Sequence, residues 1–410
     1  MARTLLIFIW LFVAWSVGYC QHTPYVILVS FDGFRHDYVE QTDAPNFKAL
    51  MKKGAYAEAL IPSFPSKTFP NHYSIITGLY PGNHGLVDNN FYDPKRNELY
   101  EMKNRQRATD PYYFGGTPLW QLARRKGLKS ASFFWVGSEL SQPDLRPDYY
   151  FPYDESIPDS QRIQQVVQWL MLSESERPHF ITLYFSSPDD EGHSFGPSSN
   201  ELKKAVLRCD SLLGILLDKV QKTQLPVNVI VVSDHGMLEL KEQPETYIFL
   251  EEILNRTDTS VQVANGGTQA HVYIKNPSRI DSVYSSLKAK AKNYSLYRRE
   301  EFPKRWHYNT ARAGDLLITA HPGFYLIDKE RKKWLAEIQP GSAFGAHGYD
   351  PAMTKNMRGI FYAVGPNIKP GKKVSAFENI HIYPFIASIL GLTTPAIDGD
   401  PKVLESILVR

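Results

Sequence analysis

The stretch Tyr-Val-Ile-Leu-Val-Ser-Phe-Asp-Gly, from Tyr25 to Gly33, decides the fold of this chain. It begins as a short apolar and β-branched run without polar alternation, which is typical of a strand buried on both faces of a sheet. Asp32 follows the run directly. We therefore predict a buried parallel strand that carries a carboxylate at its C-terminal end.

Further runs of the same kind follow along the chain, and helix patterns lie between them. The predicted strands are Tyr25–Phe31, Ser130–Trp135, Phe180–Phe185, Val227–Val232 and Gly359–Val364. The predicted helices are Tyr73–Thr77 with its upstream turn, Gln161–Met171, Glu201–Lys222 and Ile382–Leu390, the last closed by Gly391. This alternation predicts an α/β fold, with a doubly wound, mostly parallel sheet and helices on both faces.

Two stretches break this pattern. Gln142–Pro158 is rich in Pro, Asp and Tyr and is predicted to be a long ordered loop. Residues 245–341 carry their own strand and helix signals, at His271–Lys275 and Arg279–Ala291. We interpret 245–341 as a smaller α+β lobe inserted within a single domain over residues 21–410.

Composition excludes several classes of protein. Of 410 residues, 43% are hydrophobic and 22% are charged, which excludes global disorder, a collagen-like repeat and a coiled coil. The net charge of +3 is too small to make the whole surface a binder of nucleic-acid duplexes or anionic membranes. Any chemistry must therefore be local, and we expect a monomer that acts on small molecules.

Residues 1–20 are predicted to be a signal peptide. The apolar run from Leu5 to Val17 has 13 residues, too short for a membrane span of about 20 but suited to a secretory signal. Bulky Tyr19 argues against lipid anchoring at Cys20. Cleavage after Cys20 would leave Cys209 as the sole cysteine, and a secreted chain without disulfides indicates the bacterial periplasm.

Acidic residues end three of the predicted strands. Asp32 ends the first, Asp189 follows the third in Ser-Ser-Pro-Asp, and Asp234 ends the fourth in Val-Val-Ser-Asp-His-Gly. Because ligands of open parallel sheets bind outside the carboxyl ends of the strands, these carboxylates should converge there. Unpaired, they would repel one another, so we expect cations between them.

Three histidines accompany these carboxylates. His193 lies four residues after Asp189, which brings both side chains to one side of a helical turn. His235 follows Asp234, and His347 lies between small residues that allow a loop to reach the same edge. Imidazole mixed with carboxylate suits zinc in particular, although manganese or iron could also be held.

Thr68 is the candidate nucleophile. It lies in Ser-Lys-Thr-Phe-Pro-Asn-His, where Pro70 favours the first turn of a helix. Free backbone N–H groups and the helix dipole favour an anion at such a position. The sequence therefore places a hydroxyl nucleophile beside a site suited to a phosphate diester.

Six motifs, in one order, resemble those of the nucleotide pyrophosphatase/phosphodiesterase family of the alkaline phosphatase superfamily. They are Phe-Asp-Gly-Phe-Arg from Phe31, Lys-Thr-Phe-Pro-Asn-His-Tyr-Ser-Ile-Ile-Thr-Gly-Leu-Tyr-Pro from Lys67, Asp-Asn-Asn-Phe-Tyr-Asp from Asp88, Pro-Asp-Asp-Glu-Gly-His from Pro188, Ser-Asp-His-Gly-Met from Ser233 and His-Gly-Tyr-Asp from His347. The resemblance runs from about Pro24 to the C-terminal helix. It implies that residues 21–410 form one phosphodiesterase domain.

The resemblance also implies roles for individual residues. The implied ligands are Asp189, His193 and His347 for one zinc ion, and Asp32, Thr68, Asp234 and His235 for a second. Asn89 is similar to the asparagine that hydrogen-bonds a phosphate oxygen. The implied reaction is hydrolysis of nucleoside triphosphates and nucleotide diesters to nucleoside 5'-monophosphates, through a threonyl-nucleotide intermediate on Thr68.

Two aromatic residues point to nucleotide substrates. Phe69 follows the nucleophile, and Tyr153 in Phe-Pro-Tyr-Asp-Glu-Ser is similar to the aromatic residue that faces it in nucleotide-hydrolysing members, so the two rings could enclose a base. A choline or glycerol phosphodiesterase on the same scaffold is the enzymatic alternative. A non-catalytic, metal-stabilised binding protein is the alternative from another class. A sulfatase is disfavoured because Ser66–Pro70 lacks the Cys/Ser-x-Pro-x-Arg pattern.

Overall fold

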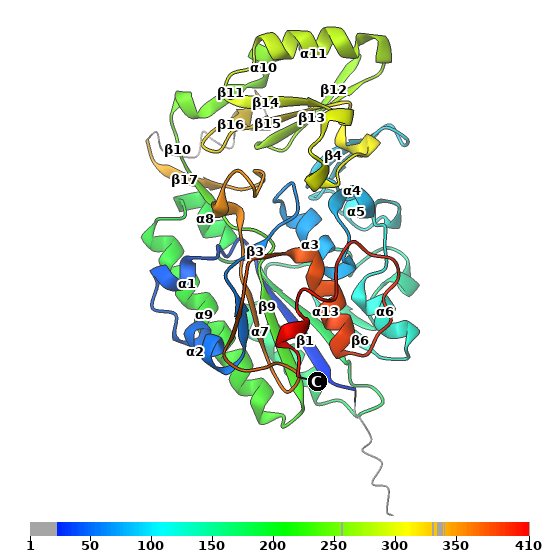
Figure 1. The fold of residues 1–410 in the computed structure, drawn as a ribbon, viewed down its shortest axis with the longest axis vertical. Coiled ribbons are helices and arrows are strands. Elements are labelled where there is room, and N and C mark those ends of the chain that lie inside the picture. The colour runs from blue at the N-terminus through cyan, green and yellow to red at the C-terminus, as the bar shows by residue number, and fades with distance from the viewer. Residues whose placement is uncertain (1–22, 256, 330–331, 334–338, 340, 410) are drawn as a thin grey trace, which may run out of the picture.

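The computed structural model of this protein describes residues 23–255, 257–329, 332–333, 339 and 341–409. The predicted signal peptide and Cys20 lie outside the described residues. An eight-stranded sheet with the order β19-β2-β18-β9-β1-β8-β6-β7 forms the centre of the described chain (Figure 1). Its strands are β1 (Tyr25–Phe31), β2 (Ala55–Ala57), β6 (Ser130–Phe133), β7 (Tyr149–Phe151), β8 (Phe180–Phe185), β9 (Val227–Val232), β18 (Phe361–Val364) and β19 (Lys372–Val374).

The predicted mostly parallel sheet is confirmed. β1 pairs in parallel with β8 and with β9, β8 pairs in parallel with β6, and β6 with β7. β18 is the exception, because it runs antiparallel to both β9 and β2. The strand predicted over Gly359–Val364 therefore exists from Phe361 onward but with reversed direction, which apolar periodicity cannot reveal.

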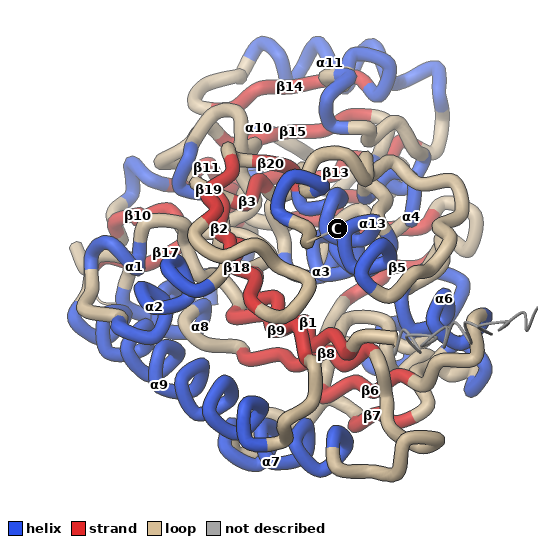
Figure 2. Tube along the Cα trace, turned by 60° about the horizontal axis from the view of Figure 1, so that its bottom comes forward, coloured by secondary structure: helices blue, strands red, loops and turns tan. Residues whose placement is uncertain are grey.

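Helices cover both faces of this sheet, as predicted (Figure 2). The helices on one face are α3 (Thr68–Thr77), α6 (Leu119–Arg125) and α13 (Ile382–Ile389), and those on the other are α2 (Pro45–Lys53), α7 (Asp159–Leu170) and α9 (Asn200–Lys222). Val26 and Leu28 of β1 join the core of the first face, and Ile27 and Val29 join that of the second. Because both faces are buried, β1 needs apolar residues at every position, which explains its sequence.

A second, four-stranded antiparallel sheet lies beyond the C-terminal edge of the main sheet (Figure 1). Its order is β12-β13-β15-β14, from β12 (Val261–Asn265), β13 (Gln269–Ile274), β14 (Tyr294–Arg298) and β15 (Leu316–Ala320), and α11 (Ile280–Ala289) packs on it. β11 (Tyr247–Phe249), α10 (Leu250–Ile253) and β16 (Tyr325–Ile327) lie beside it. These elements fall within residues 245–341, the predicted lobe.

Short elements make up much of the rest of the described chain. They are α1 (Tyr38–Gln41), β3 (Leu60–Ile61), α4 (Pro81–His84), β4 (Asn90–Asp93), β5 (Glu98–Glu101), α5 (Arg105–Ala108), α8 (Asp189–Phe195), β10 (Leu238–Lys241), β17 (Ala343–Ala346) and β20 (Phe377–Glu378). Antiparallel β10 and β17 pair Leu238 with Ala346, which carries His347 back toward His235. None of the described helices combines the length and the apolar character that a membrane crossing requires.

The prediction that Gln142–Pro158 is a loop is wrong for three residues. Tyr149–Phe151 forms β7, the edge strand of the main sheet, in register with β6 through the pair Ala131 and Tyr149. A strand of three residues is too short to show a periodic pattern, and its flanking prolines read as loop signals. Tyr153 lies two residues after this strand.

Candidate active site

Three carboxylates lie together at the C-terminal edge of the main sheet. Asp32 directly follows β1, Asp189 begins α8 after β8, and Asp234 follows β9. Because these strands are parallel neighbours, their side chains meet. Gly33, with a φ of 65°, allows the closest approach, since a Cβ there would lie 2.6 Å from Asp189 Oδ1.

Three histidines turn the same ring nitrogen toward these carboxylates. In each ring Nδ1 faces a backbone carbonyl, that of Gly345 for His193 at 2.9 Å, of Gly236 for His235 at 2.9 Å and of Ser66 for His347 at 2.8 Å. A carbonyl can only accept, so Nδ1 carries the proton in each ring and Nε2 presents its lone pair. This is the arrangement in which histidines bind metal ions.

The Nε2 atoms point at one another and at the carboxylates. His347 Nε2 lies 3.1 Å from His193 Nε2, which in turn lies 3.4 Å from Asp189 Oδ2. His235 Nε2 lies 3.0 Å from Asp234 Oδ2 and 3.6 Å from Asp32 Oδ1. Two lone pairs at 3.1 Å repel, so the geometry fits a cation held between the rings.

Each of the three carboxylates has a buried oxygen without a hydrogen-bond partner among the described residues. These atoms are Asp32 Oδ1, Asp189 Oδ1 and Asp234 Oδ2. A buried, unsatisfied carboxylate oxygen is costly in a folded protein. Three of them in one place, beside three imidazole nitrogens, fit divalent cations of the zinc type.

The pKa values show the strain of gathering these groups. Burial raises the pKa of Asp32 well above its ordinary value, and the nearby carboxylates of Asp234 and Asp189 raise it further. Burial would also raise the pKa of Asp234, but His235 and His72 outweigh it and lower that pKa to about 2. Burial, together with His235, Lys67 and His193, holds the pKa of His347 well below its usual range, which keeps its ring neutral.

Three groups of these side chains have ligand atoms that all lie within 4.8 Å of one another. They are Asp189 with His193 and His347, Asp32 with Asp189 and His235, and Asp32 with His72 and Asp234. The first is the set expected for one zinc ion. Of the residues expected around the other ion with Thr68, His235 lies within 3.6 Å of Asp32 and 3.0 Å of Asp234.

His72 is a site residue that the sequence reasoning missed. Its ring is fully buried, with Nδ1 3.0 Å from the Thr68 carbonyl and Nε2 2.8 Å from Ser30 Oγ. Because both nitrogens already have protein partners, we assign His72 to holding the first turn of α3 in place rather than to a metal. Its position four residues after Thr68 was the available signal, since such residues share a helix face.

Thr68 and Asn89 meet at the start of α3. Thr68 is the first residue of this helix, and its Oγ lies 3.3 Å from His235 Nε2. The Phe69 N–H donates to Asn89 Oδ1 at 2.9 Å, which fixes the orientation of the Asn89 amide. The Nδ2 group of Asn89 therefore remains as a donor beside Thr68.

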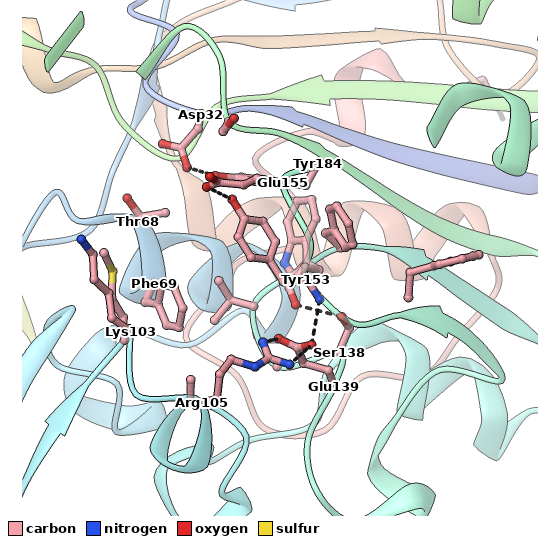
Figure 3. A pocket seen from close by; sticks show the side chains of 18 of the residues that line it. Asp32, Thr68, Phe69, Lys103, Arg105, Ser138, Glu139, Tyr153, Glu155 and Tyr184 are labelled. Carbon is pink, nitrogen blue, oxygen red and sulfur yellow. Dashed lines mark hydrogen bonds and ion pairs between the residues drawn. The ribbon is translucent and has the colours of Figure 1, made fainter. Parts of the chain in front are cut away.

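A cavity of about 370 Å³ opens from this site. Asp32, Thr68 and Asp189 are among the residues that line it, and Phe69 and Tyr153 stand on opposite sides of it (Figure 3). Its volume lies within the range of small-molecule sites. The structure thus brings both predicted aromatic residues to one cavity with Thr68, the predicted nucleophile.

Three further residues that line the cavity, Tyr184, Arg105 and Glu139, were not predicted from the sequence. The Tyr184 hydroxyl donates to Asp32 Oδ2 at 2.6 Å, which leaves only Oδ1 of that carboxylate free. Arg105 and Glu139 form an ion pair, and Glu139 also accepts from the Tyr153 N–H at 3.0 Å. Arg105 and Glu139 lie 34 residues apart, and no local motif links them.

Comparisons with known proteins agree with this geometry. The family profile described as "Type I phosphodiesterase / nucleotide pyrophosphatase" matches residues 26–350. Human ectonucleotide pyrophosphatase/phosphodiesterase family member 1 is 36% identical over 403 residues, which are 94% of this chain and 42% of that protein. A venom phosphodiesterase of Crotalus durissus collilineatus is 35% identical over 396 residues, 93% of this chain and 46% of that protein. The chain thus spans less than half the length of these curated relatives.

The match with one solved structure covers the whole of the other chain. Murine ectonucleotide pyrophosphatase/phosphodiesterase 5, as an inactive variant in complex with AMP, matches with a TM-score of 0.85 and 30% identity over 94% of this chain and 100% of that one. Fold and site together define the class, an α/β fold of the type found in the phosphodiesterases. The chain belongs to the type I phosphodiesterase/nucleotide pyrophosphatase family, which confirms the resemblance in its motifs.

Proposed function

We propose that this protein is a two-zinc nucleotide pyrophosphatase/phosphodiesterase that uses Thr68 as its nucleophile. The observation that carries the proposal is the convergence of three unsatisfied carboxylate oxygens and three Nε2 lone pairs next to the Thr68 hydroxyl. Asp189, His193 and His347 would hold one ion, and Asp32, Thr68, Asp234 and His235 the other. When bound, zinc supplies positive charge that favours a threonine alkoxide and neutralises a phosphate diester.

Thr68 and the groups around it then perform the displacement at phosphorus. Thr68 Oγ attacks phosphorus in line with the leaving oxygen, so one P–O bond forms as the other breaks. Asn89 Nδ2 and the Thr68 N–H, at the start of α3, stabilise the charge on the non-bridging oxygens. Water then displaces Thr68 from the threonyl-nucleotide and releases a nucleoside 5'-monophosphate.

The cavity supports nucleotide substrates. Phe69 and Tyr153 could stack on the two faces of a base, a contact that tolerates any base. The murine relative that binds AMP has the same fold over nearly the whole of this chain, which supports the same ligand class here. We therefore expect nucleoside triphosphates and nucleotide diesters to be hydrolysed.

One observation favours a second candidate, a choline or glycerol phosphodiesterase. Glu155 and Asp190 line the cavity, and burial, with the carboxylates of Asp189 and Glu155, raises the pKa of Asp190 to about 6. Carboxylates beside aromatic rings can hold a quaternary ammonium group. Nucleotide substrates remain the first choice because the Arg105–Glu139 pair and the Tyr153 ring form a polar and aromatic wall suited to a base.

A hydrolysis panel on the purified protein tests the proposal. ATP, a nucleotide diester, glycerophosphocholine and a sulfate ester would be compared in the presence of zinc, with release of AMP as the expected product from ATP. Faster turnover of glycerophosphocholine than of ATP would favour the second candidate. Binding of AMP without turnover of any ester would favour a non-catalytic binding protein.

We also propose that the mature protein is an exported monomer, secreted to the bacterial periplasm. The proposal rests on the apolar run from Leu5 to Val17, outside the described residues. Mass spectrometry of the secreted protein should find a mature N-terminus near Gln21. Light scattering should give a mass of one chain.

A further inference from the structure

Asp88, the residue before Asn89, is fully buried and bonded to the second sheet. Its Oδ1 accepts from the Asn89 N–H at 2.6 Å. Its Oδ2 lies 3.0 Å from His271 Nε2 and also accepts from the Gln269 amide, and both residues belong to β13. All three side chains are 0% exposed, so these bonds have no competition from water.

The partners of Asp88 are themselves held in place. His271 Nδ1 lies 3.0 Å from the Ala313 carbonyl, so the ring is bonded at both ends. Gly266, at the turn before β13, packs directly on Asp88, since a Cβ there would lie 3.0 Å from Oδ2. Burial would raise the pKa of Asp88, but hydrogen bonding and charge from His271, with Lys67 and Gln269, lower it, so the buried carboxylate stays ionised.

The same turn also binds the residue before the nucleophile. Lys67 Nζ donates to the Gly266 carbonyl at 2.9 Å and to the His347 carbonyl at 2.8 Å. Lys67 precedes Thr68 as Asp88 precedes Asn89. Both residues that are proposed to contact the phosphate group therefore follow a buried charged residue that is bonded to the β12–β13 hairpin.

We infer that Asp88 is a positioning residue for hydrolysis, and that it sets the place of Asn89 through its bonds to His271 and Gln269. This inference rests on the proposed function. The hydrogen bond that the Asn89 N–H donates to Asp88 Oδ1 fixes the Asn89 backbone. The hydrogen bond that the Phe69 N–H donates to Asn89 Oδ1 fixes the side-chain amide of Asn89, which leaves Nδ2 directed as a donor. The second sheet thereby contributes to turnover through Asn89 without itself contacting the phosphate.

A double-mutant cycle separates positioning from a merely structural role. Asp88→Asn keeps the size of the side chain but removes the charge that His271 and Gln269 bond. In an otherwise native protein it should lower kcat for a nucleoside 5'-monophosphate p-nitrophenyl ester by about tenfold, with little change in KM, because a misplaced donor acts on the transition state. In an Asn89→Ala background the same substitution should change kcat by less than about twofold, because the group it positions is already gone.

Asp93→Asn is the matched control. Asp93 ends β4, the strand that begins two residues after Asp88. It is 1% exposed and pairs with Arg312 at 2.8 Å, so it resembles Asp88 in burial and pairing. It should lower the unfolding temperature but change kcat by less than about twofold. If Asp88→Asn does not fold, His271→Gln removes the imidazole partner from the other side of the contact, and the same cycle applies.

The outcomes are distinct. Equal losses of kcat from Asp88→Asn in the native and Asn89→Ala backgrounds would overturn the positioning role while leaving the proposed function intact. A loss from Asp93→Asn as large as that from Asp88→Asn would also overturn it, because any buried pair would then suffice. A native protein that cleaves no phosphodiester would overturn the proposed function, and with it the reaction that Asp88 is said to serve.

Discussion

Replacing Tyr153 removes one wall of the cavity with little cost to the core. The Tyr153 ring is 40% exposed, and it packs edge-on against Phe134 with centroids 5.1 Å apart. Its hydroxyl donates to Glu155 Oε1 at 2.6 Å, and Glu155 also lines the cavity. Tyr153→Ala should therefore leave the fold and the proposed metal ligands in place while removing one face of the proposed base site.

The size of the effect follows from the geometry. Stacking of a base on an aromatic ring is worth about 1 to 3 kcal/mol. Because Phe69 would still cover the other face of the base, we expect a loss at the lower end of this range, about 1.4 kcal/mol, which is about tenfold in affinity. KM for nucleotide esters should rise about tenfold with kcat nearly unchanged, since the base is bound alike in the ground state and the transition state.

The assay compares two esters that share a leaving group. A nucleoside 5'-monophosphate p-nitrophenyl ester has a base to stack, whereas an alkyl p-nitrophenyl phosphate has none, so only the first should respond to Tyr153→Ala. Tyr153→Phe is the matched control, because it keeps the ring and removes only the bond to Glu155. An equal rise in KM for both esters, or an equal effect of Tyr153→Phe, would refute base stacking by this residue.

Three further outcomes are expected. Thr68→Ala should lower kcat by at least about 10³-fold with an unchanged unfolding temperature, whereas Thr68→Ser should keep part of the rate. Near-normal turnover by Thr68→Ala would exclude a threonyl intermediate. Elemental analysis of the active protein should find two zinc ions per chain. A chelator should abolish activity and lower the unfolding temperature, because the site carboxylates then repel one another. Full activity with less than one metal ion per chain would contradict this prediction. Burial lowers the pKa of His84 to about 3, below the value of about 6.5 in an unfolded chain. The unfolded state therefore binds the extra proton between these pH values. The free energy of unfolding should decrease as the pH is lowered from about 6.5 to about 3, by up to about 1.4 kcal/mol per pH unit. His84→Gln should flatten that slope in urea unfolding measured at several pH values, and an identical slope in the variant would assign the loss to other groups.

Local sequence was sufficient for the central strands β1, β8 and β9. Each of them is a short apolar run, and burial on both faces leaves no position for a polar alternation, so the pattern identifies the strand without knowledge of its neighbours. Parallel strands end at one edge, so the positions of Asp32, Asp189 and Asp234 after such runs were enough to predict that they would meet. His193 was predictable for the same reason, because a spacing of four residues determines a shared helix face.

The remaining features depend on contacts between distant segments. β18 runs antiparallel because of how the chain returns to the sheet, and the short strand β7 forms only because β6 offers it an edge. The Nδ1 proton of His347 is fixed by the Ser66 carbonyl, 281 residues away, and Asp88 finds His271 183 residues along the chain. By itself the sequence determined which side chains reach the sheet edge, because strand burial and helix spacing are local properties. Only the tertiary structure decided which atom each side chain presents there, because that depends on hydrogen-bond partners brought in by the packing of the two sheets.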